Sequence, residues 1–510
     1  MPSSGAQPAP PNREKCKHDS LTFSPSNHAV TWGYSPYTNQ QILTAITGKR
    51  KHSPRAAFSH HLDIFPAPLV LPGDEIDVDP TCPPQSFRSW VNLGVRNHVT
   101  SRRNVIYVAV SPEIDPSVGY MREWCRPKVD SSMNSKTPIQ STLDISSVVA
   151  YLQAFYHGLE VKLFPTKLTF TSWTHSPGHR PTRSQKTPSK GHSGVEYVAL
   201  STQRELVRIR VRSRAPLDSV SPPHLFPYTH QLNLSDLTDG AISILPSDAY
   251  ALLLTTVHDI YESDDDDFCC GRAWGASRVA IVSSARYDPA LDKLHAVDED
   301  HVWPASHCKT FVEEMSRENL DGEGLDRVEK RRKITKSATA AYSLSLQKAL
   351  KAHMTSVNVP PLSPLDISSA NLFRLCRTAS HELGHCLGLD HCMYKACLMQ
   401  GAASVAEDLR QPPYLCPICE RKVGWAVWGR DMARSMPKAK VGKTKGKNKR
   451  TLNREMDNSD WERKFSNWKL DRCLAMKRFC EGQGGSFAVF AAWLEDMLEV
   501  TGTRSGGSDL

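Results

Sequence analysis

The sequence has no run of apolar residues long enough to cross a lipid bilayer, which takes about 20 of them in an α-helix. Its start leads into a polar, proline-rich stretch, whereas a secretion signal has an apolar core there. We therefore expect an intracellular protein, cytoplasmic or nuclear, with no signal peptide, no transmembrane segment and no membrane partner. Disulfides are rare in such compartments, so closely spaced members of the 14 cysteines are expected to bind metal.

The chain also has little excess positive charge outside one short segment. Its formal net charge is +9, and the run from Lys438 to Arg450 contains seven Lys or Arg residues and no acid. A nucleic-acid-binding fold usually carries its basic residues on one folded face, and base stacking needs aromatic residues, which this run lacks. A flexible linker is the preferred interpretation, with a nuclear-localisation or nucleic-acid-binding segment as the alternative. Nucleic acid is thus not an expected partner, and we assume a monomer.

The length of 510 residues allows two or three domains, or one large domain with long extensions. Hydrophobic residues make up 39% of the chain, which can support a core, while the 35 prolines indicate that much of the chain lies outside it. Composition predicts a disordered extension over residues 1–60, a main domain over 61–430 with a disordered insertion over 174–192, a Lys-rich linker over 431–455, a helical segment over 456–500 and a disordered tail over 501–510.

Hydrophobic periodicity predicts the elements of the main domain. Strands are expected over residues 104–110, 163–173, 206–211 and 278–284. Helices are expected over residues 147–156, 245–257 and 365–388, and one or two more over 461–498. In the helix over 365–388, Asp366 is the candidate N-cap, and Gly388 ends the helix.

The chemistry starts at residues 381–391, which read HELGHCLGLDH and match HExxHxxGxxH. Residues four apart share a helix face, so His381 and His385 can reach one ion. Gly388 permits a tight turn that brings His391 back as a third ligand. Three neutral imidazoles suit Zn²⁺ and leave one position for water. The alternative is that these histidines are ordinary surface residues that match the pattern by coincidence.

Glu382 lies beside the metal in this arrangement without being a ligand. Zinc lowers the pKa of its water from about 16 to about 7, so Glu382 can accept a proton as the water attacks a peptide carbonyl. Glu382 can then deliver that proton to the leaving amine. The motif therefore predicts a zinc-dependent metallopeptidase acting on peptides or proteins, with Glu382 as general base and acid. A catalytically weak zinc-binding interaction module is the alternative.

Four cysteines follow the histidines with the spacing C-x4-C-x18-C-x2-C, namely Cys392, Cys397, Cys416 and Cys419. This spacing predicts a second, structural zinc with four cysteine ligands. A redox CxxC or disulfides are the alternatives. Because His391 and Cys392 are adjacent but must belong to different ions, we expect the structural zinc to fix the backbone that presents the third catalytic ligand. The prediction is two zinc ions per chain.

These residues resemble the archaemetzincins, a branch of the metzincin metallopeptidases. The resemblance rests on the histidine motif, on Cys392, Cys397 and Met399, and on the later CxxC; the interval between Met399 and the CxxC is one residue shorter here. It implies the eukaryotic form with extensions and an α+β, metzincin-like fold, in which a mixed twisted sheet accompanies an active-site helix and a zinc-stapled C-terminal subdomain.

The resemblance also implies roles for two further features. Met399 would pack beneath the histidines, with an ordinary core methionine as the alternative. The strand over residues 278–284 would be the edge strand that pairs with an extended substrate, with an interior strand as the alternative.

Other polar clusters are weaker candidates. The acids of residues 264–267 fit no calcium loop and favour a solvated loop. His301, His307 and Cys308 could bind metal but are more simply isolated polar or buried residues. Cys376 and Cys386 are expected to pack as small apolar groups.

Overall fold

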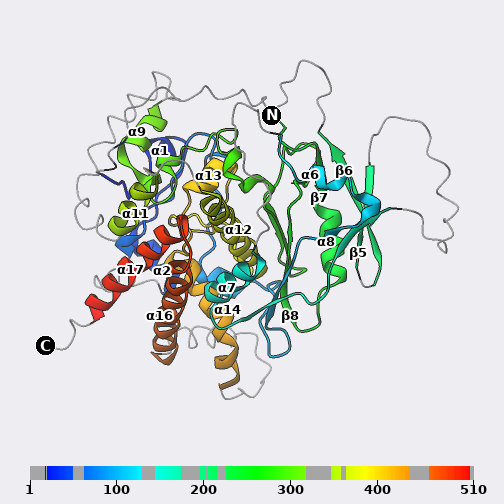
Figure 1. Cartoon of the computed structure of the whole chain (residues 1–510). Coiled ribbons are helices and arrows are strands. Elements are labelled where there is room, and N and C mark those ends of the chain that lie inside the picture. The colour runs from blue at the N-terminus through cyan, green and yellow to red at the C-terminus, as the bar shows by residue number, and fades with distance from the viewer. Residues whose placement is uncertain are drawn as a thin grey trace.

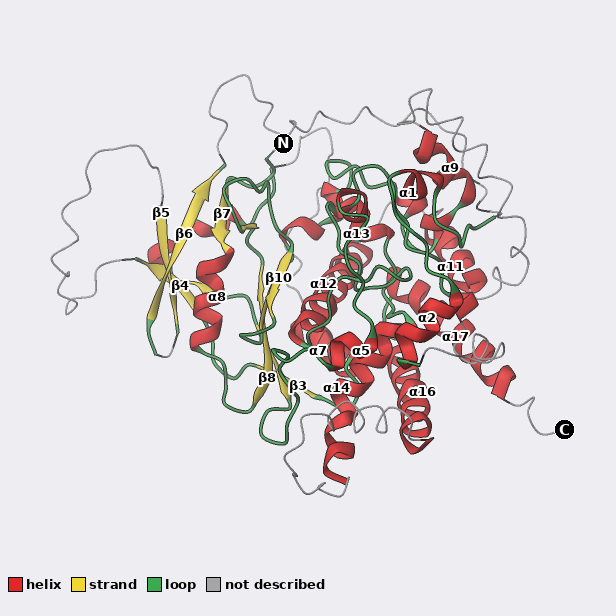
Figure 2. Cartoon of the chain, turned by 180° about the vertical axis from the view of Figure 1, so that it is seen from behind, coloured by secondary structure: helices red, strands yellow, loops and turns green. Residues whose placement is uncertain are grey.

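The computed structural model describes residues 16, 18, 20–49, 62–128, 144–173, 196–202, 204–214, 226–317, 346–357, 363–435 and 459–505 (Figure 1). Two sheets lie on one side of the molecule and most helices on the other (Figure 2). Helix α8 (Leu234–Ser243) lies between the two sheets and contacts strands of both. The predicted insertion over 174–192 and the basic run from Lys438 to Arg450 lie outside the described residues.

The five-stranded sheet has the order β10-β11-β8-β1-β3. Its strands β11, β8, β1 and β3 are parallel, and β10 is antiparallel to β11, so the sheet is mixed as predicted. The strands are β1 (Val105–Ala109), β3 (Glu160–Leu163), β8 (Ala249–Thr256), β10 (Gly271–Trp274) and β11 (Val279–Ser283).

Two predictions about this sheet are wrong. The segment expected as a helix over 245–257 is strand β8, every residue of which is buried. A short, continuous apolar run fits a buried parallel strand as well as a buried helix, so periodicity did not distinguish them. The resemblance implied an edge position for strand β11, but the strand lies between β8 and β10, so the interior position given as the alternative holds. The edge strand is β10, because the turn after it folds the chain back antiparallel onto β11.

The second sheet has six strands in the order β2-β4-β5-β6-β7-β9. They are β2 (Glu113–Ile114), β4 (Thr169–Ser172), β5 (Glu196–Ser201), β6 (Leu206–Ser213), β7 (His230–Asn233) and β9 (Ile260–Tyr261). The strand predicted over 206–211 is confirmed as part of β6, whereas that over 163–173 is shortened to β4.

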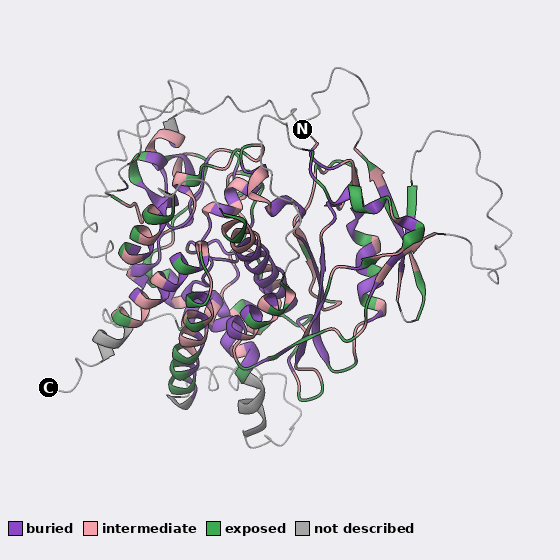
Figure 3. Cartoon of the chain, in the orientation of Figure 1, coloured by how far each residue is buried: buried purple, intermediate pink, exposed green. Residues whose placement is uncertain are grey.

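The helix that carries the histidine motif, α12 (Pro364–Cys386), packs with α7 (Ile145–Phe155) beside the five-stranded sheet. Buried residues follow α12 and β8 through the centre of the molecule (Figure 3). The N-cap is Ser363, and Asp366 is its partner in a reciprocal capping box, so the predicted cap is displaced by one turn. Gly388, with φ of +80°, lies just past the helix end as predicted.

The N-terminal extension was expected to be disordered over residues 1–60, which is wrong for part of it. Residues 20–49 include α1 (Asn27–Thr31) and α2 (Asn39–Thr47), and Ile42, Leu43 and Ile46 belong to the main core. Helix α2 begins in a capping box made by Thr38 and Gln41, a local signal hidden by the polar composition around it. Residues 1–15 and 50–61 lie outside the described residues.

The C-terminal segment forms two helices, α16 (Ser459–Glu481) and α17 (Ser486–Ser505), which follow α14 (Pro417–Ser435). They are not appended, because Trp461, Trp468 and Phe490 join the main core. The predicted tail over 501–510 starts too early, since α17 continues to Ser505. The remaining helices of four or more residues are α4 (Glu75–Val78), α5 (Phe87–Val91), α6 (Met121–Trp124), α9 (Lys309–Arg317), α11 (Gln347–Val357) and α13 (Val405–Arg410). No helix among the described residues combines the length and apolar character that a membrane span requires.

Candidate metal centres and active site

The three histidines of the motif meet beside the C-terminal end of α12. One ring nitrogen from each of His381, His385 and His391 lies within 4.8 Å of the others. His381 and His385 are one turn apart on the helix, and the turn at Gly388 returns the chain so that His391 faces them. The structure therefore brings together the residues that the spacing selected.

The tautomers of the two helical histidines suit a cation. Nδ1 of His381 lies 2.7 Å from the carbonyl oxygen of Leu398, and Nδ1 of His385 lies 2.6 Å from that of Leu389. A carbonyl only accepts, so each Nδ1 carries the hydrogen and each neutral ring turns an Nε2 lone pair inward. These two Nε2 atoms are 2.9 Å apart. Two acceptors facing each other at that distance fit a shared metal ion, and the donor set fits zinc.

Burial favours the neutral form of both rings. Burial and the neighbouring His391 lower the pKa of His385 to about 4. Burial and the two other histidines also lower the pKa of His381 well below its usual value. Imidazole binds metal in its neutral form, so these rings are ready to coordinate at neutral pH.

Glu382 belongs to α12, and its side chain faces Gly271 of the edge strand β10. The residue is 7% exposed. A Cβ atom at Gly271 of β10 would lie 3.2 Å from Cγ of Glu382, so the glycine leaves the room that this side chain occupies. Burial raises the pKa of Glu382 to about 8, against the opposing positive charge of Arg272. A bound divalent cation would favour the ionised carboxylate, the form that a general base needs.

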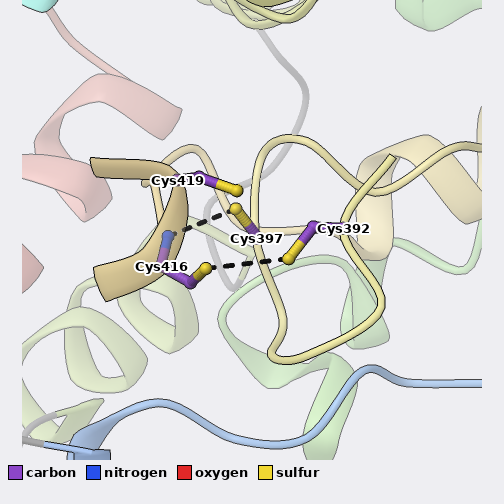
Figure 4. A group of neighbouring side chains, drawn as sticks. All are labelled: Cys392, Cys397, Cys416 and Cys419. Atoms are coloured by element: carbon purple, nitrogen blue, oxygen red, sulfur yellow. Dashed lines mark hydrogen bonds between the residues drawn. The ribbon is translucent and has the colours of Figure 1, made fainter. Parts of the chain in front are cut away.

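The four cysteines of the second motif are buried and form one cluster (Figure 4). Their sulfur atoms lie within 4.8 Å of one another. Sγ of Cys392 is 3.6 Å from Sγ of Cys416, close to the roughly 3.8 Å edge of a tetrahedron with zinc–sulfur bonds of about 2.3 Å. The backbone N–H of Cys416 donates to Sγ of Cys397, as helix α14 begins. No cysteine is in a disulfide, which leaves the four thiols free to coordinate.

The cysteine cluster is connected to the histidines at two points. Cys392 follows His391, and its N–H donates to the carbonyl of Met399 at 2.6 Å. Cys397 precedes Leu398, whose carbonyl accepts the Nδ1–H of His381. The cluster thus borders the backbone that presents one histidine and the backbone that orients another. The sequence suggested only the first connection.

Met399 packs against the helix that carries the histidine motif. The residue is fully buried. A Cβ at Gly384 would lie 2.5 Å from Sδ of Met399, so this methionine packs directly against the backbone beside His385. Only a glycine at position 384 allows this approach.

Glu75, at the start of α4, is a site residue that the sequence did not reveal. Its Oε1 lies 2.6 Å from Nδ1 of His391. Although burial opposes the effect, the hydrogen bond and charge of His391 lower the pKa of Glu75, with help from His385 and Arg272. The backbone N–H of Glu75 donates to the carboxylate of Glu407 at 3.0 Å, which fixes this position. No motif marks a lone acid more than 300 residues before the histidines.

The weaker candidates are accounted for separately. Backbone carbonyls of the acidic loop over 263–267 accept hydrogen bonds from Arg212, which favours a held loop over a cation site. His307 is buried, and its Nε2 lies 3.1 Å from the carbonyl oxygen of Ala67. Cys376 and Cys386 lie in the main core, as expected of small apolar groups.

Residues 353–424, which include all seven candidate ligands, match the family model of peptidase family M54. Archaemetzincin-2 of Pongo abelii is 25% identical over 372 residues, which are 73% of this chain and 72% of that protein. Archaemetzincin-1 of Homo sapiens is 49% identical over 197 residues, which are 36% of this chain and 30% of that protein. A crystal structure of an archaemetzincin from Methanopyrus kandleri is 14% identical and has a TM-score of 0.27, covering 64% of this chain and 97% of that chain.

The chain is thus related to the zinc metallopeptidases. More narrowly, it is a relative of the archaemetzincins, and the resemblance predicted from its histidine and cysteine motifs is confirmed. The predicted α+β class is confirmed as well.

Proposed function

We propose that this protein hydrolyses peptide bonds at a zinc ion held by His381, His385 and His391. The observation that carries the proposal is the pair of inward-facing Nε2 atoms of His381 and His385, 2.9 Å apart, with the carboxylate of Glu382 on the same helix. Neither ring can donate to the other, because each Nδ1–H is already used by a backbone carbonyl. A metal ion satisfies both lone pairs.

When bound, zinc supplies a Lewis acid that polarises the peptide carbonyl and lowers the pKa of a water molecule. Glu382 would accept a proton from the attacking water and give it to the leaving amine. Its burial between α12 and β10 keeps bulk water away from this proton. Glu75 holds the ring of His391 through Nδ1 and leaves Nε2 for the metal.

The substrate we propose is an extended peptide or protein segment bound along β10. This strand ends the order of the five-stranded sheet, so one row of its backbone groups is not used within that sheet. An edge of this kind accepts a further strand through main-chain hydrogen bonds. Gly271 at the start of β10 is next to Glu382, which would place the scissile bond near the base.

The second zinc, on Cys392, Cys397, Cys416 and Cys419, has no open position for substrate, and we propose a structural role for it. We place the protein inside the cell, because its four clustered thiols are stable in a reducing compartment. The peptidase domain expected over 61–430 would also include α2, α16 and α17, whose apolar residues share its core.

The test is cleavage of a peptide library by the purified full-length chain. We expect cleavage that stops when a chelator removes zinc and returns when zinc is restored. A zinc-loaded, folded chain that cleaves no peptide would refute the proposal and favour the alternative of a zinc-binding interaction module.

A further inference from the structure

A third group of metal-binding residues lies apart from both centres. Ligand atoms of Cys16, His18 and His301 are within 4.8 Å of one another. Sγ of Cys308 lies 3.2 Å from Sγ of Cys16, and both thiols are beside the ring of His301. The sequence favoured isolated polar or buried residues at His301 and Cys308. Both are buried, but they are not isolated, because the N-terminal segment brings Cys16 and His18 beside them.

The two histidine rings are buried and incompletely bonded. His18 and His301 are each 6% exposed. Within the described part of the chain, three ring nitrogens make no hydrogen bond of good geometry, namely both nitrogens of His18 and Nε2 of His301. The backbone of Asp300 lies beside His18. A buried polar atom without a partner is costly. A ligand held between the two rings and the two thiols would satisfy one nitrogen of each ring.

The second nitrogen of His301 is already oriented. Nδ1 of His301 lies 2.8 Å from Oδ2 of Asp298, which turns Nε2 toward the two thiols. A carboxylate on the outer nitrogen is the usual partner of a metal-binding histidine, because it fixes the ring and makes it a better donor.

The backbone holds this arrangement across 292 residues of sequence separation. Thr22 N–H donates to the carbonyl of His307 at 2.8 Å, and Lys309 N–H donates to the carbonyl of Ser20 at 2.9 Å. Leu21 and Cys308 form an antiparallel bridge between these two bonds. Cys16 and His18 thus enter from one strand-like segment, and Cys308 from the segment beside it.

We propose that Cys16, His18, His301 and Cys308 form a third metal site, which binds Zn²⁺ through two thiolates and two imidazoles. This donor set matches tetrahedral structural zinc and leaves no position open for substrate. It shares no residue with the histidine centre or the four-cysteine centre. The chain would then hold three zinc ions rather than the two expected from its sequence.

The site would anchor the N-terminal segment near the active site. Leu69 and Leu71 pack in one cluster with Cys308 and Cys16. The N–H of Leu71 donates to the carboxylate of Asp74, and the next residue, Glu75, contacts His391. A metal at Cys308 therefore supports the segment from which Glu75 reaches the catalytic histidine.

A disulfide between Cys16 and Cys308 is the competing explanation. It would use the two sulfurs but leave the three unbonded nitrogens of His18 and His301 unsatisfied. A zinc ion satisfies the sulfurs and a nitrogen of each ring together, which is why the geometry favours it.

The experiment is zinc analysis of the full-length chain, purified without added metal and with its free thiols counted. We expect three zinc ions per chain, falling to two in Cys16→Ser and in His18→Ala. His18→Cys replaces one ligand with another and should keep three. Cys82→Ser changes a part-buried cysteine that belongs to no metal-binding group among the described residues; it is the matched control and should also keep three.

Two zinc ions in the unmodified chain, or three that remain in both Cys16→Ser and His18→Ala, would overturn the site. So would a Cys16–Cys308 disulfide found by mass spectrometry in the zinc-loaded protein. A chain that fails to fold would lose all its zinc, and His18→Cys then decides the question, because only coordination explains its rescue. Peptide cleavage is not the readout, so the result is independent of the proposed activity.

Discussion

Oε1 of Glu75 lies 2.6 Å from Nδ1 of His391, which joins the N-terminal part of the chain to the third histidine of the motif. The contact leaves Nε2 of His391 for a metal, and partners of this kind typically contribute about 10–100-fold in metal affinity or activity. We predict that Glu75→Ala weakens zinc binding at the histidine centre by about that factor. The measurement is the rate at which a chelator abolishes peptide cleavage.

Glu113→Ala provides the control, because Glu113 is an exposed acid paired with Lys167 on the second sheet. It should match the unmodified chain. If Glu75→Ala instead increases cleavage at unchanged zinc occupancy, Glu75 blocks the site rather than supporting His391.

Glu382→Gln removes the base while keeping the shape of the side chain. Because Glu382 is not a ligand, zinc content should stay unchanged, while the turnover of a peptide falls by about 10²–10⁴-fold, the usual contribution of a general base. Steady-state kinetics together with zinc analysis separate the two effects. Cleavage at the normal rate with full zinc would show that another group moves the proton.

The sequence predicted the parts of the site whose spacing is local. His381 and His385 share a helix face, and Gly388 turns the chain just past the helix end. Cys416 and Cys419 form a CxxC. Each of these pairs is close in space because it is close in sequence. Glu75 reaches His391 only through the packing of segments more than 300 residues apart, which no local pattern encodes.

The same limit applies to secondary structure. The helix of residues 365–388 shows clear periodicity, whereas β8 is buried on both faces and therefore has no alternation to read. Helix α2 was missed because its polar flanks resemble disordered sequence, although Ile42 and Ile46 enter the core.

The C-terminal helix α16 is predicted to be part of the folding unit. Trp468 is 2% exposed, and its Nε1–H donates to the carbonyl of His157 at 2.7 Å, next to α7. Trp468→Ala should lower the free energy of unfolding by about 3–5 kcal/mol. Leu470→Ala on the same helix removes a 49% exposed side chain and should change it by less than about 0.5 kcal/mol. Equal denaturation midpoints for the two variants would show that α16 is an accessory.

The four-cysteine site and the three-histidine site are expected to depend on each other. Cys416→Ser removes one ligand from the four-cysteine site, which borders His391 through Cys392 and Leu398 through Cys397. Losing the structural zinc should free both backbone segments, so that His391 and the acceptor of the His381 Nδ1–H lose their positions. We therefore expect the zinc content to fall by two ions per chain and peptide cleavage to be lost.

Cys473→Ser is the control, because Cys473 is a part-buried cysteine on α16 that belongs to no metal-binding group among the described residues. It should keep its zinc and its activity. A Cys416→Ser chain that loses one zinc ion but cleaves peptide at the normal rate would show that the centres are independent. The two separate backbone connections argue for the other result, because Glu75 holds only the side-chain ring of His391 and not the backbone that Cys392 borders.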